Sequence, residues 1–461
     1  MGTRRGRRRA AARPGIPAGV AGRGGRGERR YPVVARTGGI DGATRARRGR
    51  PGSRPTAAAR GAVTGAVAGP GTPGLRPPLP LIFAVTATGI TANTLVAPAV
   101  PDILEGLDAS RGYAGLLVGA ATLPGILLAP LIGLLADRFG RRQVLLPCLV
   151  VFGVAGGLGA VAPSLWVLVA LRLAQGVGSA GLINLAVVII GDHWQGTERA
   201  RMIGRNAAVL TTSLAVLPTL GGWLTEVGGW RAPFLLYPLA LVTALLLGRY
   251  LPRVPPLQVA FRRQLTLALP LLRTTTVLGT LSAAMITFAL IFGLLLTVLP
   301  LHLEQAFGID ATVRGLILGL PALTNTSAAL MLGRLRARFG RRSLLGAALV
   351  CFVVALSMVA SASGLPILVA GILLFGVGEG LMVPNLQDIT VGAAPDSSRG
   401  TIVAIFVSAS RLGQTTGPVV AGVGLAAVGA PATFAGGAVL AALLLVALLV
   451  AHRGARAVVG G

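Results

Sequence analysis

Three ionisable residues, Arg172, Glu379 and Arg411, lie within long apolar stretches of the sequence. Ionisable groups inside membrane spans are costly, and they commonly mark ion, proton or substrate pathways. Glu379 is the member of this set that can exchange a proton, because burial disfavours its charged form. The set therefore predicts proton-coupled chemistry, and a permanently paired structural carboxylate is the alternative.

Polar side chains accompany these charges. Gln175 follows Arg172 on the same face at helical spacing, and Asn93 and Asn385 lie within other apolar stretches. Each amide could bind substrate, although hydrogen bonding to a neighbouring helix is the commoner role of such groups. We predict a proton-coupling or cavity set of six residues: Arg172, Gln175, Glu379, Arg411, Asn93 and Asn385.

The rest of the sequence offers no catalytic or metal-binding pattern. Cys148 and Cys351 lie in apolar runs and the three histidines lie far apart, so we expect no disulfide framework and no metal site. No glycine-rich phosphate loop, nucleophile elbow or pair of catalytic carboxylates is found. The sequence therefore predicts neither an enzyme nor an ATP-driven pump, and it predicts no bound cofactor.

The composition indicates a membrane protein, since 53% of the residues are hydrophobic and only 12% are charged. Soluble domains carry about 25% charged residues. From residue 79 onward, apolar stretches of about 20 residues recur, which is long enough to cross a bilayer. We predict twelve spans: 80–104, 112–135, 143–162, 164–190, 203–225, 232–251, 276–300, 312–333, 344–362, 365–391, 400–427 and 431–451.

Arginine placement predicts the orientation of these spans. With the N-terminus in the cytoplasm, the inner loops and the C-terminal tail hold 19 arginines after residue 78, and the outer loops hold only Arg111, Arg231 and Arg314. Such an excess indicates the cytoplasmic side. We therefore expect a multi-pass protein of the cell's inner (plasma) membrane with both termini in the cytoplasm.

Residues 1–78 differ from the rest, with 18 arginines, many glycines and prolines, and no apolar periodicity. Such a segment cannot bury enough apolar surface to offset its ordering entropy, so we expect disorder. An arm that binds nucleic acid or anionic lipid is one interpretation. A solvated tail or an over-extended translation start is the simpler one, so no specific nucleic-acid partner is predicted.

A shift of 200 residues aligns the two halves of the chain. Residues 133–142 fall on 333–342, and Pro218 and Gly222 fall on Pro418 and Gly422. One register holds for about 100 residues, which predicts two parallel repeats related by an axis along the membrane normal. The predicted organisation is a disordered cytoplasmic tail at 1–78, a six-helix bundle at 79–251, a cytoplasmic linker at 252–275, a second six-helix bundle at 276–451 and a cytoplasmic tail at 452–461.

The loop after the second predicted span resembles the signature loop of the major facilitator superfamily. The matching residues are Gly133, Asp137, Arg138, Gly140, Arg141 and Arg142. The resemblance implies an all-α membrane fold of 12 helices in two parallel six-helix repeats, with this loop latching the halves together in the outward-facing state. The second copy keeps Gly333, Arg338, Gly340, Arg341 and Arg342. It has Ala337 where the first copy has Asp137, so we expect an asymmetric latch.

Two further elements resemble those of proton-coupled members of that family. Residues 172–178 are similar to an element associated with proton coupling, whereas Asn93 stands where many relatives carry an acid. The family fold places the helices of Glu379 and Arg411 side by side, so we hypothesise an ion pair between them. Residues similar to the antiporter element are Gly413, Gly417, Pro418 and Gly422, with Pro218, Gly221 and Gly222 in the first half. Close helix packing is the alternative role of these small residues.

The sequence therefore predicts a secondary active transporter that works by alternating access and is driven by the proton gradient. Few charges and few aromatic residues in the spans favour export of drug-like or amphipathic small molecules by a monomer in the lipid bilayer. Two alternatives stay open: a proton-coupled importer of a small metabolite, and a non-transporting receptor or scaffold.

Overall fold

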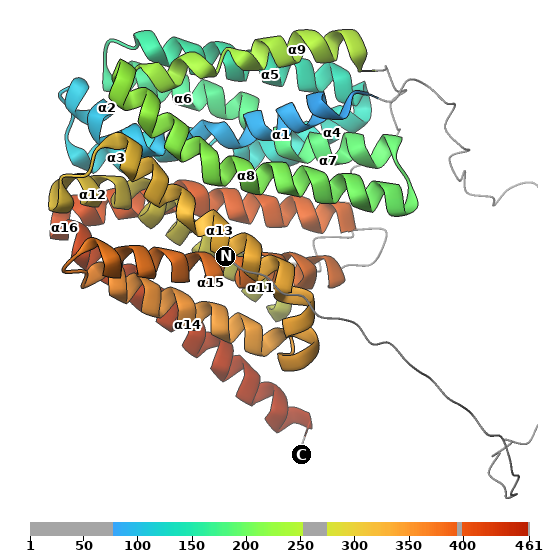
Figure 1. Ribbon diagram of the computed structural model, residues 1–461. Coiled ribbons are helices and arrows are strands. Elements are labelled where there is room, and N and C mark those ends of the chain that lie inside the picture. Colours follow the sequence, from blue (N-terminus) through green and yellow to red (C-terminus); the bar gives the residue numbers. More distant parts are fainter. Residues whose placement is uncertain (1–76, 252–273, 394–398, 460–461) are drawn as a thin grey trace, which may run out of the picture. The chain divides into compact units, whose positions relative to one another are not determined.

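The computed structural model describes residues 77–251, 274–393 and 399–459, with side chains to residue 393 and from 402 to 450. The predicted tail up to residue 76 and the linker residues 252–273 lie outside the described residues. All regular elements within the described part are helices (Figure 1), which confirms the predicted all-α class.

The helices before residue 251 are α1 (Leu79–Thr94), η1 (Ala97–Ala99), α2 (Val100–Gly106), η2 (Arg111–Tyr113), α3 (Ala114–Ala120), α4 (Gly125–Phe139), α5 (Arg141–Leu158), η3 (Gly159–Val161), α6 (Leu165–Ser179), α7 (Leu182–His193), α8 (Gly196–Gly228), η4 (Ala232–Leu236) and α9 (Leu239–Tyr250). Those after residue 274 are α11 (Thr275–Leu290), the π-helix η6 (Ile291–Val298), α12 (Leu299–Phe307), α13 (Ala311–Phe339), α14 (Arg341–Ala360), α15 (Leu365–Gly392) and α16 (Arg399–Val459).

Eleven stretches of described helix are long and apolar enough to cross a membrane, so the chain is a multi-pass membrane protein. Ten of them each cover one predicted span and leave at most two residues of it outside. The eleventh, Ile402–Val450, covers both of the last two predicted spans, 400–427 and 431–451.

A glycine in α16 separates those last two predicted spans. Gly429 has φ 79° and ψ 171°, which is not a helical conformation. Gly229, which lies 200 residues earlier, has φ 72° and ψ 173° and ends α8. Positive φ at such points favours glycine, which lacks the Cβ that would clash. The chain therefore makes a similar backbone turn at Gly429 as it makes after α8.

The same interval of 200 residues separates two other pairs of residues with positive φ. Gly140 and Gly340 have φ 96° and 76° and lie between consecutive helices. Asp108 and Gly308 have φ 48° and 63°. Aspartate is one of the few other residues that adopts this conformation readily. The interval found in the sequence thus recurs in backbone geometry.

The first membrane-crossing stretch is interrupted after α1. Pro98 and Pro101 follow closely, and proline has no N–H and its ring clashes with the carbonyl one turn before it. A short 3₁₀ segment therefore replaces the α-helix at this point. The last carbonyls of α1 are left without helical partners, and other side chains bind them.

Extensive helix contacts join the first half of the chain to the second: α8 packs along α13, and α16 packs along α3 and α4. Figure 1 shows these helices at the boundary between the two groups. Gly115 lies against the backbone of Pro418, and Gly315 lies against the backbone of Pro218, so neither glycine has room for a Cβ. Because the partners exchange when 200 is added or subtracted, the contact between the halves is reciprocal, as in a two-fold interface.

Candidate functional site

The side chain of Arg172 lies inside the first half, where it is 1% exposed. One of its nitrogens donates to Gln175 Oε1 at 2.9 Å, and another donates to Asn93 Oδ1 at 2.9 Å. It also donates to the carbonyl of Ala92, one of those freed by the interruption after α1. The structure therefore brings together three of the six predicted site residues, and the two terminal nitrogens of the arginine donate to neutral acceptors, whereas its Nε has no hydrogen-bond partner among the described residues.

Tyr237 completes this cluster and was not predicted from the sequence. Its hydroxyl donates to the carbonyl of Ala92 at 3.1 Å, and its ring is 2% exposed. The side chain comes from the segment between η4 and α9, which is distant in sequence from both α1 and α6. No motif marks this tyrosine, because only the fold brings it to the end of α1.

Glu379 lies in α15 and is partly exposed. Gly376 and Gly380 on either side of it pack closely against the backbone of α13. This packing places the carboxyl beside Asn325, the side chain with which it interacts. The two glycines therefore bring Glu379 close to α13, where its side-chain partner is a neutral amide.

Arg411 lies in α16 and is also partly exposed. Its guanidinium donates to Gln414 Oε1 at 3.2 Å. Although α15 and α16 are in contact, the hypothesised ion pair between Arg411 and Glu379 is not among those formed by the described residues. The physical reason is orientation: Glu379 lies beside α13, whereas Arg411 lies against Gly125 of α4.

Asn385 does not join the predicted cavity set. It is 0% exposed, its nitrogen donates to the carbonyl of Leu381 at 2.7 Å, and its oxygen accepts from Arg336 at 2.7 Å. The amide oxygen therefore links α15 to the end of α13, whereas the amide nitrogen bonds within α15. Its role is to support a cluster of charges there.

The two signature loops lie at the same end of the helices, which we call the Arg141 end. In the first loop, Arg141 pairs with Asp137 at 2.7 Å and with Asp192 of α7 at 3.1 Å. In the second, Arg336 and Arg341 share Asp388 of α15, at 2.9 and 2.8 Å.

The two loops differ in the charge of their clusters, in line with the asymmetry expected from Ala337. The first cluster has one guanidinium and two carboxylates, and the second has two guanidiniums and one carboxylate. The neighbouring arginines Arg138 and Arg338 lie over the rings of Phe139 and Phe339, at 5.5 and 5.4 Å. Arg142 donates to the carbonyl of Leu251 at 3.3 Å.

The small residues of the antiporter-like elements all lie at helix contacts. Gly413 and Gly417 pack on Met285 and Ala289 of α11. Gly221 packs on Leu95, Gly222 on Ala311, and Gly422 on Gly112 and Gly115. Pro218 and Pro418 provide the reciprocal contacts with Gly315 and Gly115. The structure accounts for these residues through close packing, and a coupling role for them stays a prediction.

At the opposite end, which we call the Asp102 end, charged side chains connect the halves. Arg314 of α13 is 2% exposed and forms an ion pair with Asp102 of α2. Arg111 and Glu304 form a second pair at 3.3 Å, and Thr312 donates to Glu226 of α8. All these contacts link an element before residue 251 with one after residue 274. These pairs could not be predicted from the sequence, because their partners come from different halves of the chain.

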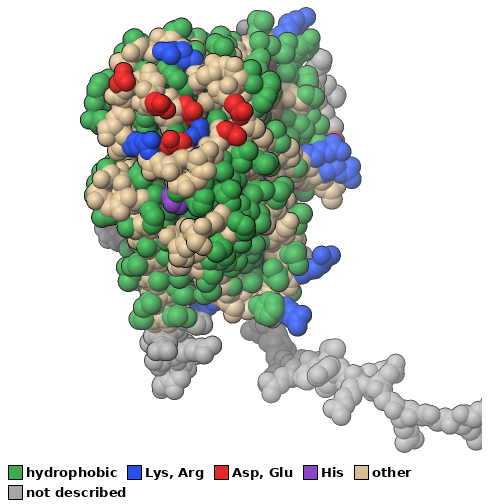
Figure 2. Space-filling view, turned by 60° about the vertical axis from the view of Figure 1, so that its left-hand side comes forward, with side chains coloured by type: hydrophobic (Ala, Val, Ile, Leu, Met, Phe, Trp, Pro, Cys, Tyr) green, Lys and Arg blue, Asp and Glu red, His purple; other side chains and the backbone are tan. Residues whose placement is uncertain are grey.

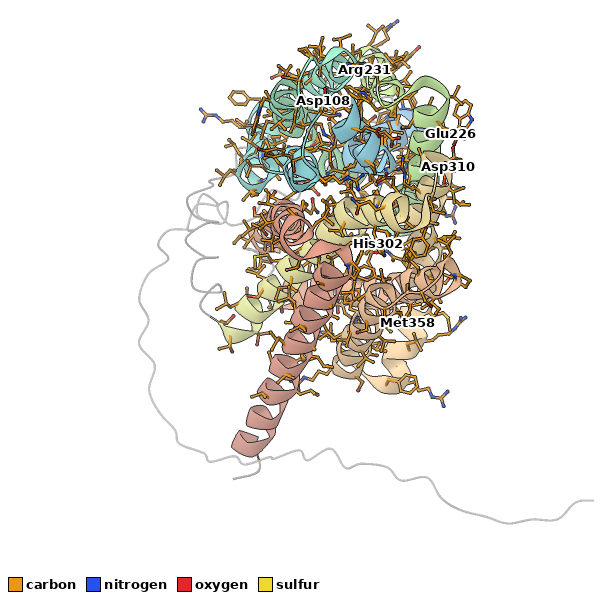
Figure 3. The ribbon with its side chains drawn as sticks, turned by 90° about the vertical axis from the view of Figure 1, so that its left-hand side faces the viewer. Asp108, Glu226, Arg231, His302, Asp310 and Met358 are labelled. Carbon is orange, nitrogen blue, oxygen red and sulfur yellow. The ribbon has the colours of Figure 1, made fainter. Side chains whose placement is uncertain are left out.

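The Asp102 end carries a group of acidic side chains, visible as red patches among blue arginines in Figure 2. Figure 3 views this end directly and labels Asp108, Glu226, Arg231 and Asp310. A cavity of about 280 Å³ lies among Pro101, Leu104, Glu105, Ala109, Arg111 and Glu304.

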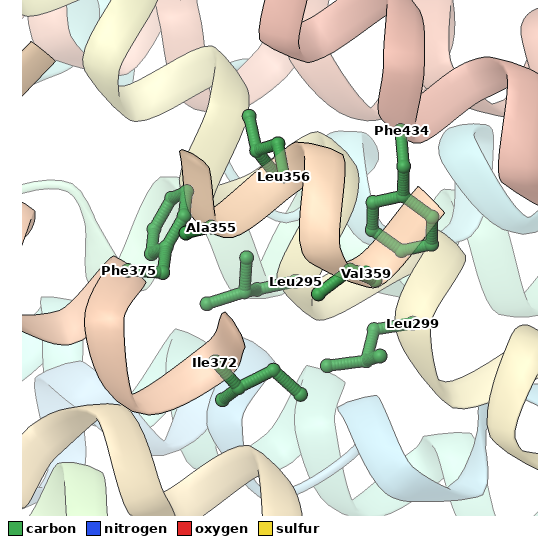
Figure 4. Close-up of a pocket in the computed structure, with 8 residues that line it drawn as sticks. All are labelled: Leu295, Leu299, Ala355, Leu356, Val359, Ile372, Phe375 and Phe434. Atoms are coloured by element: carbon green, nitrogen blue, oxygen red, sulfur yellow. The ribbon is translucent and has the colours of Figure 1, made fainter. Parts of the chain in front are cut away.

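A second, much smaller cavity lies inside the second half (Figure 4). Its volume is about 10 Å³, and only apolar side chains line it, among them Leu295, Phe375 and Phe434. A space of that size has room for about one water molecule, and an apolar lining gives a water no partner. This cavity is a packing void and is too small for a substrate.

A bundle of membrane-crossing helices with ionisable groups in mid-span and ion pairs that link its halves at one end defines a membrane transporter. The chain belongs to the Major Facilitator Superfamily, whose family model matches residues 82–300 and 281–459. This match confirms the family resemblance seen in the signature loop.

Two relatives match over most of their length. The chain is 30% identical to the "Tetracycline resistance protein, class C" of Escherichia coli, over 78% of this chain and 93% of the relative. It is 28% identical to the "Multi-drug resistance efflux pump PmrA homolog" of Lactococcus lactis subsp. lactis (strain IL1403), over 71% of this chain and 83% of the relative.

Two solved structures show the same fold. One is a bacterial homolog of the human lysosomal transporter Spinster, with a TM-score of 0.68 and 16% identity, covering 81% of this chain and 96% of that one. The other is the human organic anion transporter MFSD10, with a TM-score of 0.60 and 22% identity, covering 80% of this chain and 98% of that one. At these identities the likeness concerns the fold alone.

Proposed function

We propose that this protein is a secondary active transporter that exports drug-like or amphipathic small molecules by alternating access, driven by the proton gradient. The observation that carries the proposal is the set of ion pairs Asp102–Arg314 and Arg111–Glu304, which join the halves at the Asp102 end. Pairs of this kind can form and break as two halves rock about a central site. Export rather than import is supported by the relatives named for efflux and tetracycline resistance.

The proposed topology has twelve spans in two repeats of six. The non-helical Gly429 supports a division of α16 into two spans. The interval of 200 residues between turns, and the reciprocal contacts Gly115–Pro418 and Gly315–Pro218, support the repeat. The excess of arginine supports a cytoplasmic Arg141 end with both termini on that side, in the inner membrane of the cell.

With this orientation the described conformation is closed towards the outside. The ion pairs of the Asp102 end then form the outer closure, and the two clusters of the Arg141 end belong to the cytoplasmic side. Transport requires that the outer pairs open when the cytoplasmic side closes. The signature loop around Asp137 and Arg141 then acts in that second state.

Glu379 is the proposed proton-coupling residue. The other described carboxylates lie at or near helix ends, whereas Glu379 lies well inside α15. Its neighbour is the neutral Asn325, and none of the ion pairs among the described residues includes Glu379. A carboxyl in such surroundings can gain and lose a proton as its access to water changes.

The test is transport in proteoliposomes under an imposed pH gradient, with a panel of fluorescent cationic, zwitterionic and neutral compounds. The parent should move part of the panel against its gradient, and Glu379→Gln should lose gradient-driven transport while it keeps exchange of labelled for unlabelled substrate. Glu105→Gln, which removes an exposed carboxylate at the Asp102 end, is the matched control. Gradient-driven transport that survives in Glu379→Gln would exclude this residue as the coupling site.

The same assay separates the alternatives. An importer would accumulate compounds in the opposite direction under the same gradient. A receptor or scaffold that depends on the arginine-rich tail would lose its activity when residues 1–75 are deleted, whereas a transporter should keep it.

A further inference from the structure

Arg411 carries a charge that the described residues do not neutralise. Its one protein partner in that part of the chain is Gln414 on its own helix, a neutral amide at 3.2 Å. None of the ion pairs among the described residues includes Arg411. Among the described residues, no hydrogen bond joins another nitrogen of its guanidinium to the protein.

Arg411 lies on the side of α16 that faces the first half. Arg411 shares a helical stripe with Thr415, Pro418 and Gly422, because residues three and four apart lie on one face. Members of this stripe contact α3 and the turn after it: Pro418 meets Gly115 of α3, and Thr415 meets Thr122 of the turn at 3.0 Å.

Gly125 of α4 explains how Arg411 fits between the halves. A Cβ on Gly125 would lie 3.2 Å from Cδ and 3.3 Å from Nε of Arg411. The absence of a side chain at Gly125 therefore makes room for the stem of the arginine. Along this stripe, Pro418 contacts α3, whereas Arg411 contacts α4.

The 200-residue repeat does not explain the positive charge of Arg411. The residue 200 positions earlier is Thr211, and the counterpart of Gly125 is Asn325, so the repeat does not require a guanidinium at this place. An arginine in mid-span without a carboxylate is costly. Arg172 meets this cost with a carbonyl and two amides, whereas Arg411 has one amide.

We propose that Arg411 binds an anionic group of the transported compound, so that preferred substrates carry a carboxylate or a similar anion on an amphipathic body. A guanidinium presents a fork of donors that matches a carboxylate in two parallel hydrogen bonds. The hydroxyl of Thr122, which bonds to the carbonyl of Gln414 at 3.2 Å, lies on the first-half side of this point. This inference rests on the proposed function in one respect, namely that the ligand is the exported compound.

The experiment measures equilibrium binding of two dyes to the purified full-length protein by fluorescence anisotropy. Rhodamine B carries a free carboxylate, and its methyl ester lacks that charge on the same ring system. Arg411→Gln should weaken binding of rhodamine B by about tenfold, as expected for loss of a charge-assisted hydrogen bond, and should change binding of the ester by less than about twofold. Arg411→Lys keeps the charge but loses the fork, so it should lie between the parent and Arg411→Gln.

Arg249→Gln is the matched control, since Arg249 lies at the end of α9 beside Tyr250, far from α16 in the sequence. It should bind both dyes as the parent does. Gly125→Ala provides a second variant that keeps the charge, and it should weaken rhodamine B selectively by displacing the stem of Arg411. Absence of rhodamine B binding to the parent, or an equal effect of Arg411→Gln on both dyes, would overturn the inference.

If the partner of Arg411 were Glu379 in another conformation, Glu379→Gln and Arg411→Gln would affect both dyes alike, which also rejects the proposal. Failure of the proposed function is seen separately. In that case proteoliposomes would show no gradient-driven transport, while the selective loss of carboxylate binding in Arg411→Gln would persist.

Discussion

The guanidinium of Arg172 donates to the amide oxygen of Asn93 at 2.9 Å and thereby joins α6 to α1. Both side chains are buried, Arg172 at 1% and Asn93 at 7% exposure. The contact sits where α1 is interrupted, and it pairs a permanent charge with a neutral acceptor. The cluster is therefore suited to holding helices together, and Asn93 has no proton to exchange in it.

Replacing Asn93 should destabilise the first half. Asn93→Leu removes an acceptor from a buried guanidinium, which should cost about 2 kcal/mol and lower the midpoint of thermal unfolding. Asn93→Asp keeps an acceptor and should unfold near the parent's midpoint or above it. The matched control is Asn184→Leu, since Asn184 is an exposed amide on α7. If Asn93→Leu unfolds at the parent's temperature, the hydrogen bond does not contribute to the stability of the first half.

Breaking the ion pair of Arg314 should open the Asp102 end. Arg314→Gln removes a buried cation and leaves the carboxylate of Asp102 without its partner across the halves, and loss of one member of a buried pair is strongly destabilising. The side chain of Asp102 is 37% exposed, so water offsets part of that cost. The closed conformation should lose population to a conformation that is open at this end.

The measurement is the rate at which a maleimide labels Ala109→Cys, beside the 280 Å³ cavity, in protein with Cys148 and Cys351 changed to serine. Arg314→Gln should raise this rate several-fold. Arg231→Gln is the control, because Arg231 lies over Trp230 at 4.1 Å within its own half. Equal rates in Arg314→Gln and the parent would show that the pair does not hold the closure.

The reciprocal glycine contacts should respond alike. Gly115→Leu and Gly315→Leu each place a side chain where the structure has the backbone of Pro418 or Pro218, so both should separate the halves and raise labelling of Ala109→Cys. Gly279 of α11 has nothing within 4 Å of a Cβ position, and Gly279→Leu should leave that labelling unchanged. An effect of only one of the first two variants would contradict the reciprocal contact.

Sequence patterns could predict the features that depend on one helix or one loop. Spans follow from hydropathy, and Gln175 follows from its place one turn after Arg172. Tyr237 and the pair Asp102–Arg314 could not be predicted, because their contacts join helices that are distant in sequence. The hydrogen bond between Asn385 and Arg336 could not be predicted from depth in the span either, because it depends on which face of α15 carries the amide.

Asp137 should matter more for transport than for stability. Its pair with Arg141 is 41% exposed on the aspartate side, and such pairs contribute about 0–1 kcal/mol. Arg141 also keeps Asp192 as a partner, so Asp137→Asn should unfold near the parent's temperature. If the loop latches the halves in the state closed at the Arg141 end, the variant should nevertheless transport several-fold more slowly.

Asp388→Asn is the matched comparison at the second loop, because it leaves Arg336 and Arg341 without their shared carboxylate. Two guanidiniums then repel each other with only neutral amide oxygens, that of Asn385 among them, in place of the carboxylate, so this variant should lower the unfolding midpoint more than Asp137→Asn does. Initial rates in proteoliposomes and unfolding midpoints of both variants give the answer. The reverse order, with Asp137→Asn less stable and Asp388→Asn slower, would place the latch in the second loop and leave Asp137 as a structural pair.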